Sequence, residues 1–180
     1  MKREIETLSQ SEVKDWLIHA REKYYIEMKK ASELPSAFWE SYSAFCNTEG
    51  GFIILGVAEG YPQNEITGVG NVQKTLTTLW DQVSNTQKIS FRNIDNHDVH
   101  TISIDGKDII IIRIKEAADN MKPIYVNGKF ENTYVRTGDG DRKATKEELA
   151  AFFRNAQPVQ DSLTADKFTL DDLDIDSVIS

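Results

Sequence analysis

The sequence is poor in cysteine and in long apolar runs, and each absence excludes a class of protein. Among its 180 residues there is one cysteine, Cys46, so neither an internal disulfide framework nor a multi-cysteine zinc site can form. No apolar run approaches the roughly 20 residues of a membrane-spanning helix. Near the N-terminus, Glu4 and Glu6 stand where a secretory signal has its apolar stretch. We therefore expect a cytoplasmic protein that does not enter membranes.

Positive charge is also scarce. Lys and Arg number 21 against 29 Asp and Glu, which gives a net charge of −8. Because phosphate binding depends largely on Lys and Arg, this balance at first argues against a nucleic-acid ligand. The acids are unevenly distributed, however: six acids and one base between 158 and 180 account for five of the eight negative charges, and the other 157 residues carry −3. The net charge therefore predicts only that any binding to nucleic acid is local and salt-sensitive.

The hydrophobic patterns predict one α+β domain. A composition of 39% apolar and 28% charged residues suits a single soluble domain of this length. The predicted helices cover 9–20, 35–49, 72–83 and 145–155, and the predicted strands cover 24–28, 52–57, 66–69, 99–104, 107–114, 124–126 and 130–136. Asp105-Gly106 and Asn127-Gly128 are each a strong signal for a two-residue hairpin turn. We expect a single mixed β-sheet of five or more strands, flanked by about four helices, over residues 1–157. Residues 158–180 form either a solvated acidic tail or a linker to a further domain.

A first group of chemically interesting residues combines carboxylates with a lysine. Glu27 and Lys29 lie two residues apart in a predicted strand and so share one of its faces. Carboxylates bind Mg²⁺ or Mn²⁺, and a nearby lysine can assist phosphodiester cleavage. Glu59 follows the buried strand 52–57 and can reach the same edge, whereas Glu22 joins the group only if the chain bends around Lys23. The alternative is that these are ordinary surface acids.

A second motif lies between a predicted helix and a predicted buried strand. It consists of Asn47, Thr48, Gly50 and Gly51, followed by Gly56. The glycine pair allows positive φ angles and a close approach of the backbone. Exposed amides here would form an anion-binding nest; alternatively, the segment is a helix C-cap that leads into a tight turn.

A third motif is basic. Arg136 ends a predicted strand, and Arg142, Lys143 and Lys146 follow it closely. Clustered bases of this kind suit contacts with phosphates or with a carboxylate partner. The alternative is a solvated loop ahead of the last helix. Cys46 is more suited to packing than to nucleophilic catalysis, since no histidine is placed to activate it.

Taken together, these motifs resemble the Schlafen-type AlbA-like domain, once described as a divergent AAA ATPase domain. The resemblance spans about Glu22 to Phe153, and Cys46 stands where the family usually has alanine. The residues that carry it are Glu22, Glu27, Lys29, Ser43 to Gly51, Gly56, Val57, Glu59, Tyr134, Val135, Arg136 and Gly138. No phosphate-binding loop is present, so the older ATP-binding label gains no support from the residues.

The resemblance implies two different functions. In prokaryotes such domains begin longer proteins that are described as DNA-binding transcriptional regulators. In animal Schlafen proteins the domain is a metal-dependent ribonuclease that acts on tRNA and rRNA through three carboxylates. Those carboxylates match Glu22, Glu27 and Glu59, the last with Glu in place of Asp.

Three functional hypotheses follow. The first is a nucleic-acid-binding, regulator-type domain, expected to be a homo-oligomer, which binds DNA or RNA through a basic edge. The second is a Mg²⁺- or Mn²⁺-dependent ribonuclease with Glu22, Glu27 and Glu59 as metal ligands and Lys29 assisting. The third is a protein-interaction module without either activity. The expected basic edge consists of Lys29, Lys30, Arg136, Arg142, Lys143 and Lys146.

Overall fold

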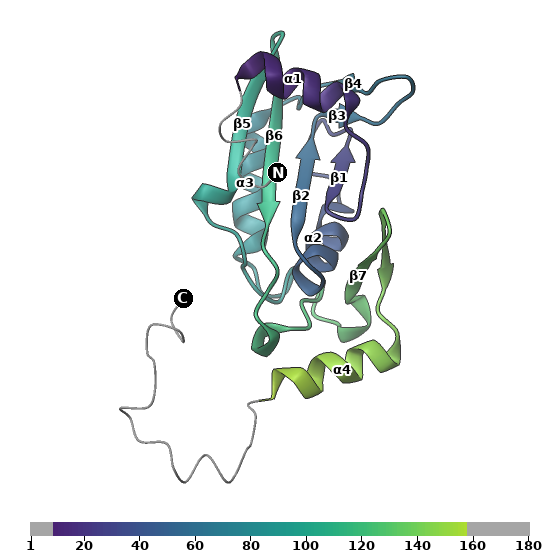
Figure 1. Cartoon of the computed structure of the whole chain (residues 1–180). Coiled ribbons are helices and arrows are strands. Elements are labelled where there is room, and N and C mark those ends of the chain that lie inside the picture. The colour runs from purple at the N-terminus through teal and green to yellow at the C-terminus, as the bar shows by residue number, and fades with distance from the viewer. Residues whose placement is uncertain (1–8, 158–180) are drawn as a thin grey trace, which may run out of the picture.

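The computed structural model describes residues 9–157, in which helices cover both faces of a β-sheet (Figure 1). The helices are α1 (Gln10–His19), α2 (Phe38–Asn47), α3 (Val72–Val83) and α4 (Lys146–Ala156), with three short 3-10 helices, η2 (Asn96–Asp98), η3 (Asp119–Met121) and η4 (Phe130–Asn132). The strands are β1 (Ile26–Lys29), β2 (Gly51–Leu55), β3 (Val57–Ala58), β4 (Glu65–Ile66), β5 (Val99–Ile104), β6 (Lys107–Ile114), β7 (Tyr134–Thr137) and β8 (Gly140–Lys143). The α+β class and the four helices agree with the sequence-based expectation.

The main sheet has four strands in the order β1-β2-β6-β5, and two smaller sheets pair β3 with β4 and β7 with β8. Strand β1 runs parallel to β2, and the other neighbours are antiparallel, so the sheet is mixed. The expectation of five or more strands in one sheet is therefore wrong. The run from Phe52 to Val57 breaks at Gly56, whose φ of 99° turns β3 away from β2 into its own pairing with β4.

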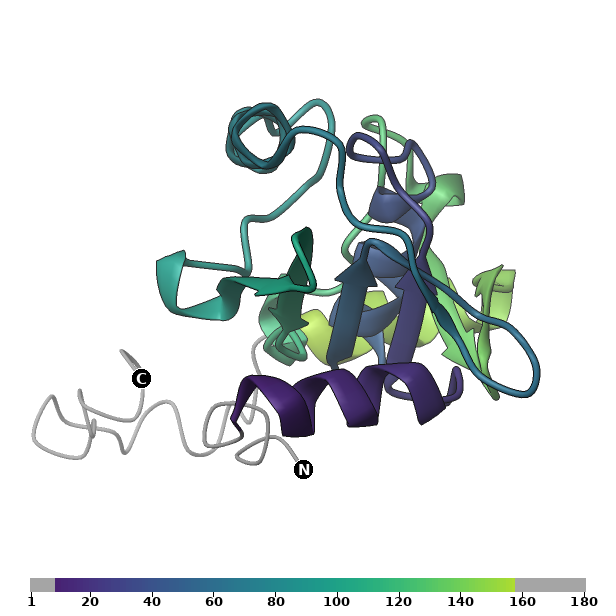
Figure 2. The same ribbon diagram turned by 90° about the horizontal axis from the view of Figure 1, so that it is seen from above.

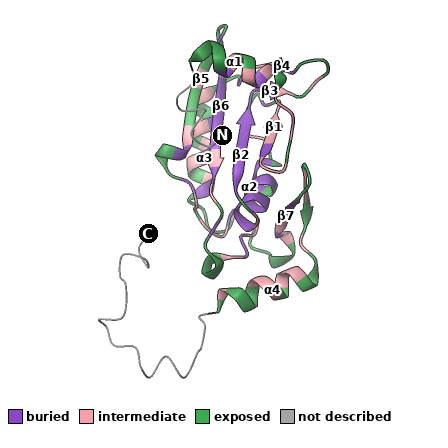
Figure 3. Ribbon diagram, in the orientation of Figure 1, coloured by how far each residue is buried: buried purple, intermediate pink, exposed green. Residues whose placement is uncertain are grey.

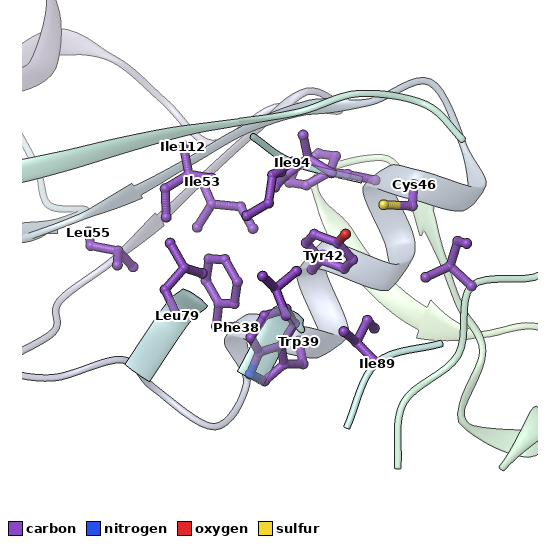
Figure 4. Close-up of a cluster of buried hydrophobic side chains, with 14 of the residues drawn as sticks. Phe38, Trp39, Tyr42, Cys46, Ile53, Leu55, Leu79, Ile89, Ile94 and Ile112 are labelled. Atoms are coloured by element: carbon purple, nitrogen blue, oxygen red, sulfur yellow. The ribbon is translucent and has the colours of Figure 1, made fainter. Parts of the chain in front are cut away.

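Two apolar cores lie on opposite faces of the sheet. On one face Phe38, Trp39 and Leu79 from α2 and α3 pack on Ile53 and Ile112 of the central strands (Figure 4). On the other face, α1 packs across the sheet (Figure 2). All five residues of β2 are buried, as its unbroken apolar run predicts (Figure 3). Each large side chain buried in this way contributes roughly 1.5–3 kcal/mol of transfer free energy.

Local sequence signals account for the ends of the helices. Ser9 and Glu12 form a reciprocal capping box at the start of α1, and Thr145 and Glu148 form another at the start of α4. Among residues 9–157 no helix is both long enough and apolar enough to cross a membrane.

The two dipeptide turn signals behave differently. Asp105 and Gly106 have φ angles of 51° and 77° and join β5 to β6 as predicted. Asn127 and Gly128 also take positive φ angles, 58° and 70°. Of the expected hairpin around them the structure has one antiparallel bridge, between Tyr125 and Thr133, because η4 occupies the segment directly after the turn. A longer hairpin joins β7 to β8.

Candidate functional site

The buried guanidinium of Arg136 in β7 organises the polar site beside β1. Its Nη1 donates to Glu27 Oε2 at 2.6 Å and to Asp141 Oδ1 at 2.8 Å. Its Nη2 donates to the carbonyls of Lys23 and Ile26 at 2.8 and 2.9 Å. The guanidinium carbon also lies 4.9 Å from the ring centre of Phe45. The Arg136 side chain has no exposed surface, so this residue joins two segments of the fold.

Burial alone would disfavour the charge on Arg136. The hydrogen bonds to Asp141 and Glu27 outweigh that effect and leave the pKa of Arg136 above its ordinary range. Lys29 adds a second cation, since its Nζ lies 3.3 Å from Glu27 Oε1. Glu27 therefore lies between two positive groups, and its own side chain is 15% exposed.

The chain bends where Glu22 requires it. Lys23 and Ile26 exchange two backbone hydrogen bonds of 3.1 and 3.2 Å, which close a turn just before β1. The turn brings Glu22 back beside the strand, where its Oε1 accepts the amide N–H of Met28 at 3.2 Å. The amide N–H of Glu22 in turn donates to Glu59 Oε2 at 2.7 Å. The condition set by the sequence for grouping Glu22 with Glu27 and Glu59 is thus met.

These carboxylates influence one another electrostatically. The pKa of Glu22 lies above its ordinary value, first because burial disfavours the charged form and then because Glu27 and Glu59 add negative charge. The amide of Met28 and the cation of Arg136 oppose the shift only in part. Glu22 therefore protonates more readily than an ordinary glutamate as the pH falls.

A shared metal ion is a separate requirement. Within residues 9–157 no group of three or more His, Cys, Asp and Glu side chains is arranged to hold one. Glu27 accepts from Arg136 and Lys29, and one oxygen each of Glu22 and Glu59 accepts a backbone N–H. As arranged, the three carboxylates do not fit a metal ion as a ligand set, and the metal site stays a prediction.

Side chains at the C-terminal end of α2 and just after it hold β7 in place beside this site. Asn47 Nδ2 donates to the carbonyls of Ile124 and Tyr134 at 2.8 and 2.9 Å, and its Oδ1 accepts the amide N–H of Ile124 at 2.7 Å. Thr48 Oγ1 accepts the amide N–H of Arg136 at 3.0 Å. These side chains do for β7 what a neighbouring strand would do, because they satisfy its backbone groups.

The glycine motif makes a turn. Gly50 has a φ of 72°, and its amide N–H donates to the carbonyl of Phe45 at 2.9 Å, which caps the end of α2. A Cβ on Gly51 would lie 2.6 Å from the Phe45 ring and from the carbonyl oxygen of Tyr25. The anion-binding nest is therefore not formed at Gly50, whose amide is already used. Burial raises the pKa of neighbouring Cys46 to about 12, which agrees with a packing role.

The residues of the expected basic edge do not form one continuous surface in the structure. Arg136 is buried and its donors are used, so its assignment as a phosphate contact is wrong. Lys29 is paired with Glu27, and Arg142 with Glu148 at 2.6 Å. The end of β1, where Lys30 follows, and the start of α4, near Lys143 and Lys146, lie at opposite ends of the molecule (Figure 1). Lys30, Lys143 and Lys146 are exposed and have no acidic partner within residues 9–157.

A surface that the sequence does not reveal lies beside α4. The ring centres of Tyr125 and Phe130 are 4.6 Å apart, and those of Phe130 and Phe153 are 5.0 Å apart. Phe130 is 49% exposed and Phe153 41%. We call these three residues the α4 aromatic patch. Phe153 lies four residues after Leu149, a spacing typical of a core-facing helix stripe, so the sequence alone does not predict its exposure.

Comparisons with known proteins place this architecture in context. A family model described as Schlafen, AlbA_2 matches residues 22–145. The solution structure of the N-terminal domain of a protein from Nitrosomonas europaea, described as related to the ATP-dependent DNA helicase RecG, has a TM-score of 0.55 and 23% identity and covers 77% of this chain and 95% of that one. The crystal structure of the DIP2311 protein from Corynebacterium diphtheriae has a TM-score of 0.52 and 16% identity and covers 88% of this chain, which spans only 30% of that protein's length. At these identities the likeness concerns the fold alone. No match appears among curated proteins.

Proposed function

Because the chain belongs to the Schlafen AlbA_2 family, we propose that it is a nucleic-acid-binding domain of a transcriptional-regulator-type protein. The observation that carries the proposal is the pair of lysines at the start of α4. Lys143 ends β8, Lys146 opens α4, and both are exposed. Neither has an acidic partner among residues 9–157, in contrast to Lys29, Arg136 and Arg142.

The N-terminus of α4 also favours the binding of a phosphate group. Amide N–H groups of a helix's first turn and the positive end of its dipole favour a phosphate. Glu148 in that turn is neutralised by Arg142, whose Nη1 and Nη2 donate to the two carboxylate oxygens at 2.6 and 3.1 Å. Glu147 is the remaining acid of the turn, so we expect binding that is weak and strongly dependent on salt.

Fluorescence anisotropy with a labelled 30-base-pair DNA duplex tests the proposal over a salt series. We expect binding at low salt that weakens as salt rises, since each phosphate contact contributes about 0.9 to the slope of log K against log salt. The Lys143→Ala/Lys146→Ala double variant should lose up to about two of these phosphate contacts, and its slope should be correspondingly shallower.

A matched control is Lys74→Ala, which removes another exposed lysine, one that pairs with Glu33 at 2.7 Å. It should leave the slope unchanged. If the wild-type protein binds neither duplex nor single strand at low salt, the proposal fails and the third hypothesis, a protein-interaction module, takes its place. An unchanged slope in the double variant would move the binding surface away from α4.

The second candidate function is cleavage of RNA. It is favoured by the bend at Lys23, which brings Glu22 beside Glu59 and into electrostatic contact with Glu27. Incubation of a tRNA with the protein and Mn²⁺ or Mg²⁺, followed by gel electrophoresis, tests it. If the protein is such a nuclease, Glu22→Gln and Glu59→Gln abolish cleavage and leave nucleic-acid binding intact. No cleavage by the wild-type protein with either ion would remove this candidate.

A further inference from the structure

The α4 aromatic patch exposes two large aromatic side chains, Phe130 and Phe153, next to each other. Phe130 bridges Tyr125 and Phe153, and the Phe130 and Phe153 rings meet edge to face at an interplanar angle of 84°. This edge-to-face contact leaves close to half of each phenylalanine side chain exposed. Exposed apolar side chains that adjoin one another in a contiguous patch, rather than singly, are typical of interaction sites.

The patch continues the surface that carries the proposed function. Lys146 and Phe153 lie seven residues apart in α4, so they share one face of the helix. At about 1.5 Å of rise per residue the two positions are separated by roughly 10 Å along the helix. That distance corresponds to about three nucleotides at roughly 3.4 Å per nucleotide of one strand.

Three basic residues lie close to the aromatic residues in the chain or through a backbone contact. Lys129 and Arg154 adjoin Phe130 and Phe153 in the sequence, and the carbonyl of Lys88 accepts the amide N–H of Asn127 in the turn before them at 2.9 Å. None of these three cations has an ion pair with another residue in the range 9–157. Glu131 is the acid of the same segment. Asp119 of η3, which packs against α4, is a second nearby acid and is paired with Lys122 at 3.6 Å. The three cations therefore outnumber the acids that have no cation beside them in this part of the fold.

We propose that the α4 aromatic patch binds single-stranded nucleic acid, with bases stacked on Phe130 and Phe153 and the flanking phosphates held by Lys129, Lys146 and Arg154. This inference rests on the proposed function and narrows its ligand to an unpaired strand. Bases have flat π-faces that a duplex hides within its stack and a single strand presents, and exposed aromatic rings with adjacent cations match that chemistry. Because every base has such a face, the site recognises unpaired strands with little preference for sequence.

The experiment compares a labelled 20-nucleotide deoxythymidine strand with a duplex of the same length, in fluorescence anisotropy at low salt with the full chain. The wild-type protein should bind the single strand more tightly than the duplex. Phe153→Ala should weaken single-strand binding on the order of 5- to 150-fold, which is the range for loss of one stacked base. Duplex binding should change less than twofold.

Two further variants separate stacking from folding. Phe153→Leu keeps an apolar side chain of similar size but has no ring, so it should lose single-strand binding as Phe153→Ala does while circular dichroism and the melting temperature stay close to wild type. Tyr61→Ala removes an aromatic side chain that is 94% exposed in the loop between β3 and β4, and should change nothing.

The outcomes distinguish the two proposals. Binding of the duplex alone, or full retention by Phe153→Leu, overturns the stacking site and leaves the nucleic-acid-binding function in place. Failure to bind either probe overturns both. If light scattering shows a wild-type oligomer that Phe153→Leu dissociates while single-strand binding is unchanged, the patch is an interface between copies of this chain and the stacking site is refuted.

Discussion

Replacing Arg136 with Met tests the structural role assigned to its guanidinium. The variant leaves the carboxylates of Glu27 and Asp141, 15% and 14% exposed, without their shared cation. It also removes the side-chain donors to the carbonyls of Lys23, Tyr24 and Ile26. Removal of one partner from a buried ion pair costs about 3–5 kcal/mol, because the remaining charge stays buried.

Such a loss is large for a domain whose total free energy of unfolding is expected to be about 5–15 kcal/mol. For a chain of this size each kcal/mol shifts the melting temperature by about 2–4 °C, so Arg136→Met should melt roughly 6–20 °C lower. Urea unfolding followed by circular dichroism measures the free energy directly. Arg142→Ala is the matched control: its exposed pair with Glu148 should cost about 1 kcal/mol or less.

The charge explanation can be separated from a loss of packing. In the triple variant Arg136→Met/Glu27→Gln/Asp141→Asn no buried carboxylate is left without a cation. We therefore expect it to recover part of the stability that Arg136→Met loses. The buried-charge reasoning is wrong if Arg136→Met lowers the free energy of unfolding by less than about 1 kcal/mol. It is also wrong if the triple variant loses as much stability as the three single variants added together.

Three further predictions concern other parts of the fold. Glu22 has a raised pKa, so the folded state holds its proton more tightly than the unfolded state. Stability should fall as the pH rises from about 4.5 through the raised pKa, and Glu22→Gln should flatten that part of a stability profile measured by urea unfolding. Arg142 and Thr145 lower the pKa of Glu148 to about 2, so the stability it contributes is present at neutral pH and is lost as the pH falls from about 4.5 towards 2. Because the pair is exposed, Glu148→Gln should remove no more than about 1 kcal/mol of it, measured against wild type over the same range. Gly51→Ala would place a Cβ 2.6 Å from the Phe45 ring, and we expect about 1–3 kcal/mol of destabilisation in thermal melts; a wild-type melting temperature would contradict the close approach.

Local sequence signals predicted the elements that depend on local physics. Helices α1 and α4 begin where the sequence predicts them, at the capping boxes of Ser9 and Thr145, and the Asp105-Gly106 turn also forms as predicted, because each of these features is decided within a few residues. The bend at Lys23 was only a condition in the sequence. The structure forms this bend, which brings Glu22 to Glu59 and Met28. A contact between residues as far apart in the chain as Glu22 and Glu59 leaves no periodic pattern in the sequence.

The role of Arg136 could not be read from the sequence for the same reason. Its position beside Arg142 and Lys143 suggests an exposed basic loop. Its partners, Glu27 and Asp141, lie in β1 and β8. Glu27 is 109 residues away in the chain, and no pattern near Arg136 points to it. Likewise, Asn127-Gly128 takes the backbone angles of a hairpin turn, yet η4 follows it, so turn chemistry alone does not decide what the flanking residues become.

The contacts of Arg136 join residues 109 to 113 positions apart in the chain, from Lys23, Tyr24, Ile26 and Glu27 to β7. All four strands of the main sheet lie between residues 26 and 114, ahead of that arginine. Synthesis proceeds from the N-terminus, and a domain generally folds as a unit once its segments are available. Before β7 has been synthesised, the chain already contains every strand of the main sheet. Glu27, however, does not yet have the Arg136 guanidinium as a partner. The site beside β1 is thus a late product of chain growth, and a translation product that stops short of residue 136 carries the sheet's sequence without the means to finish that site.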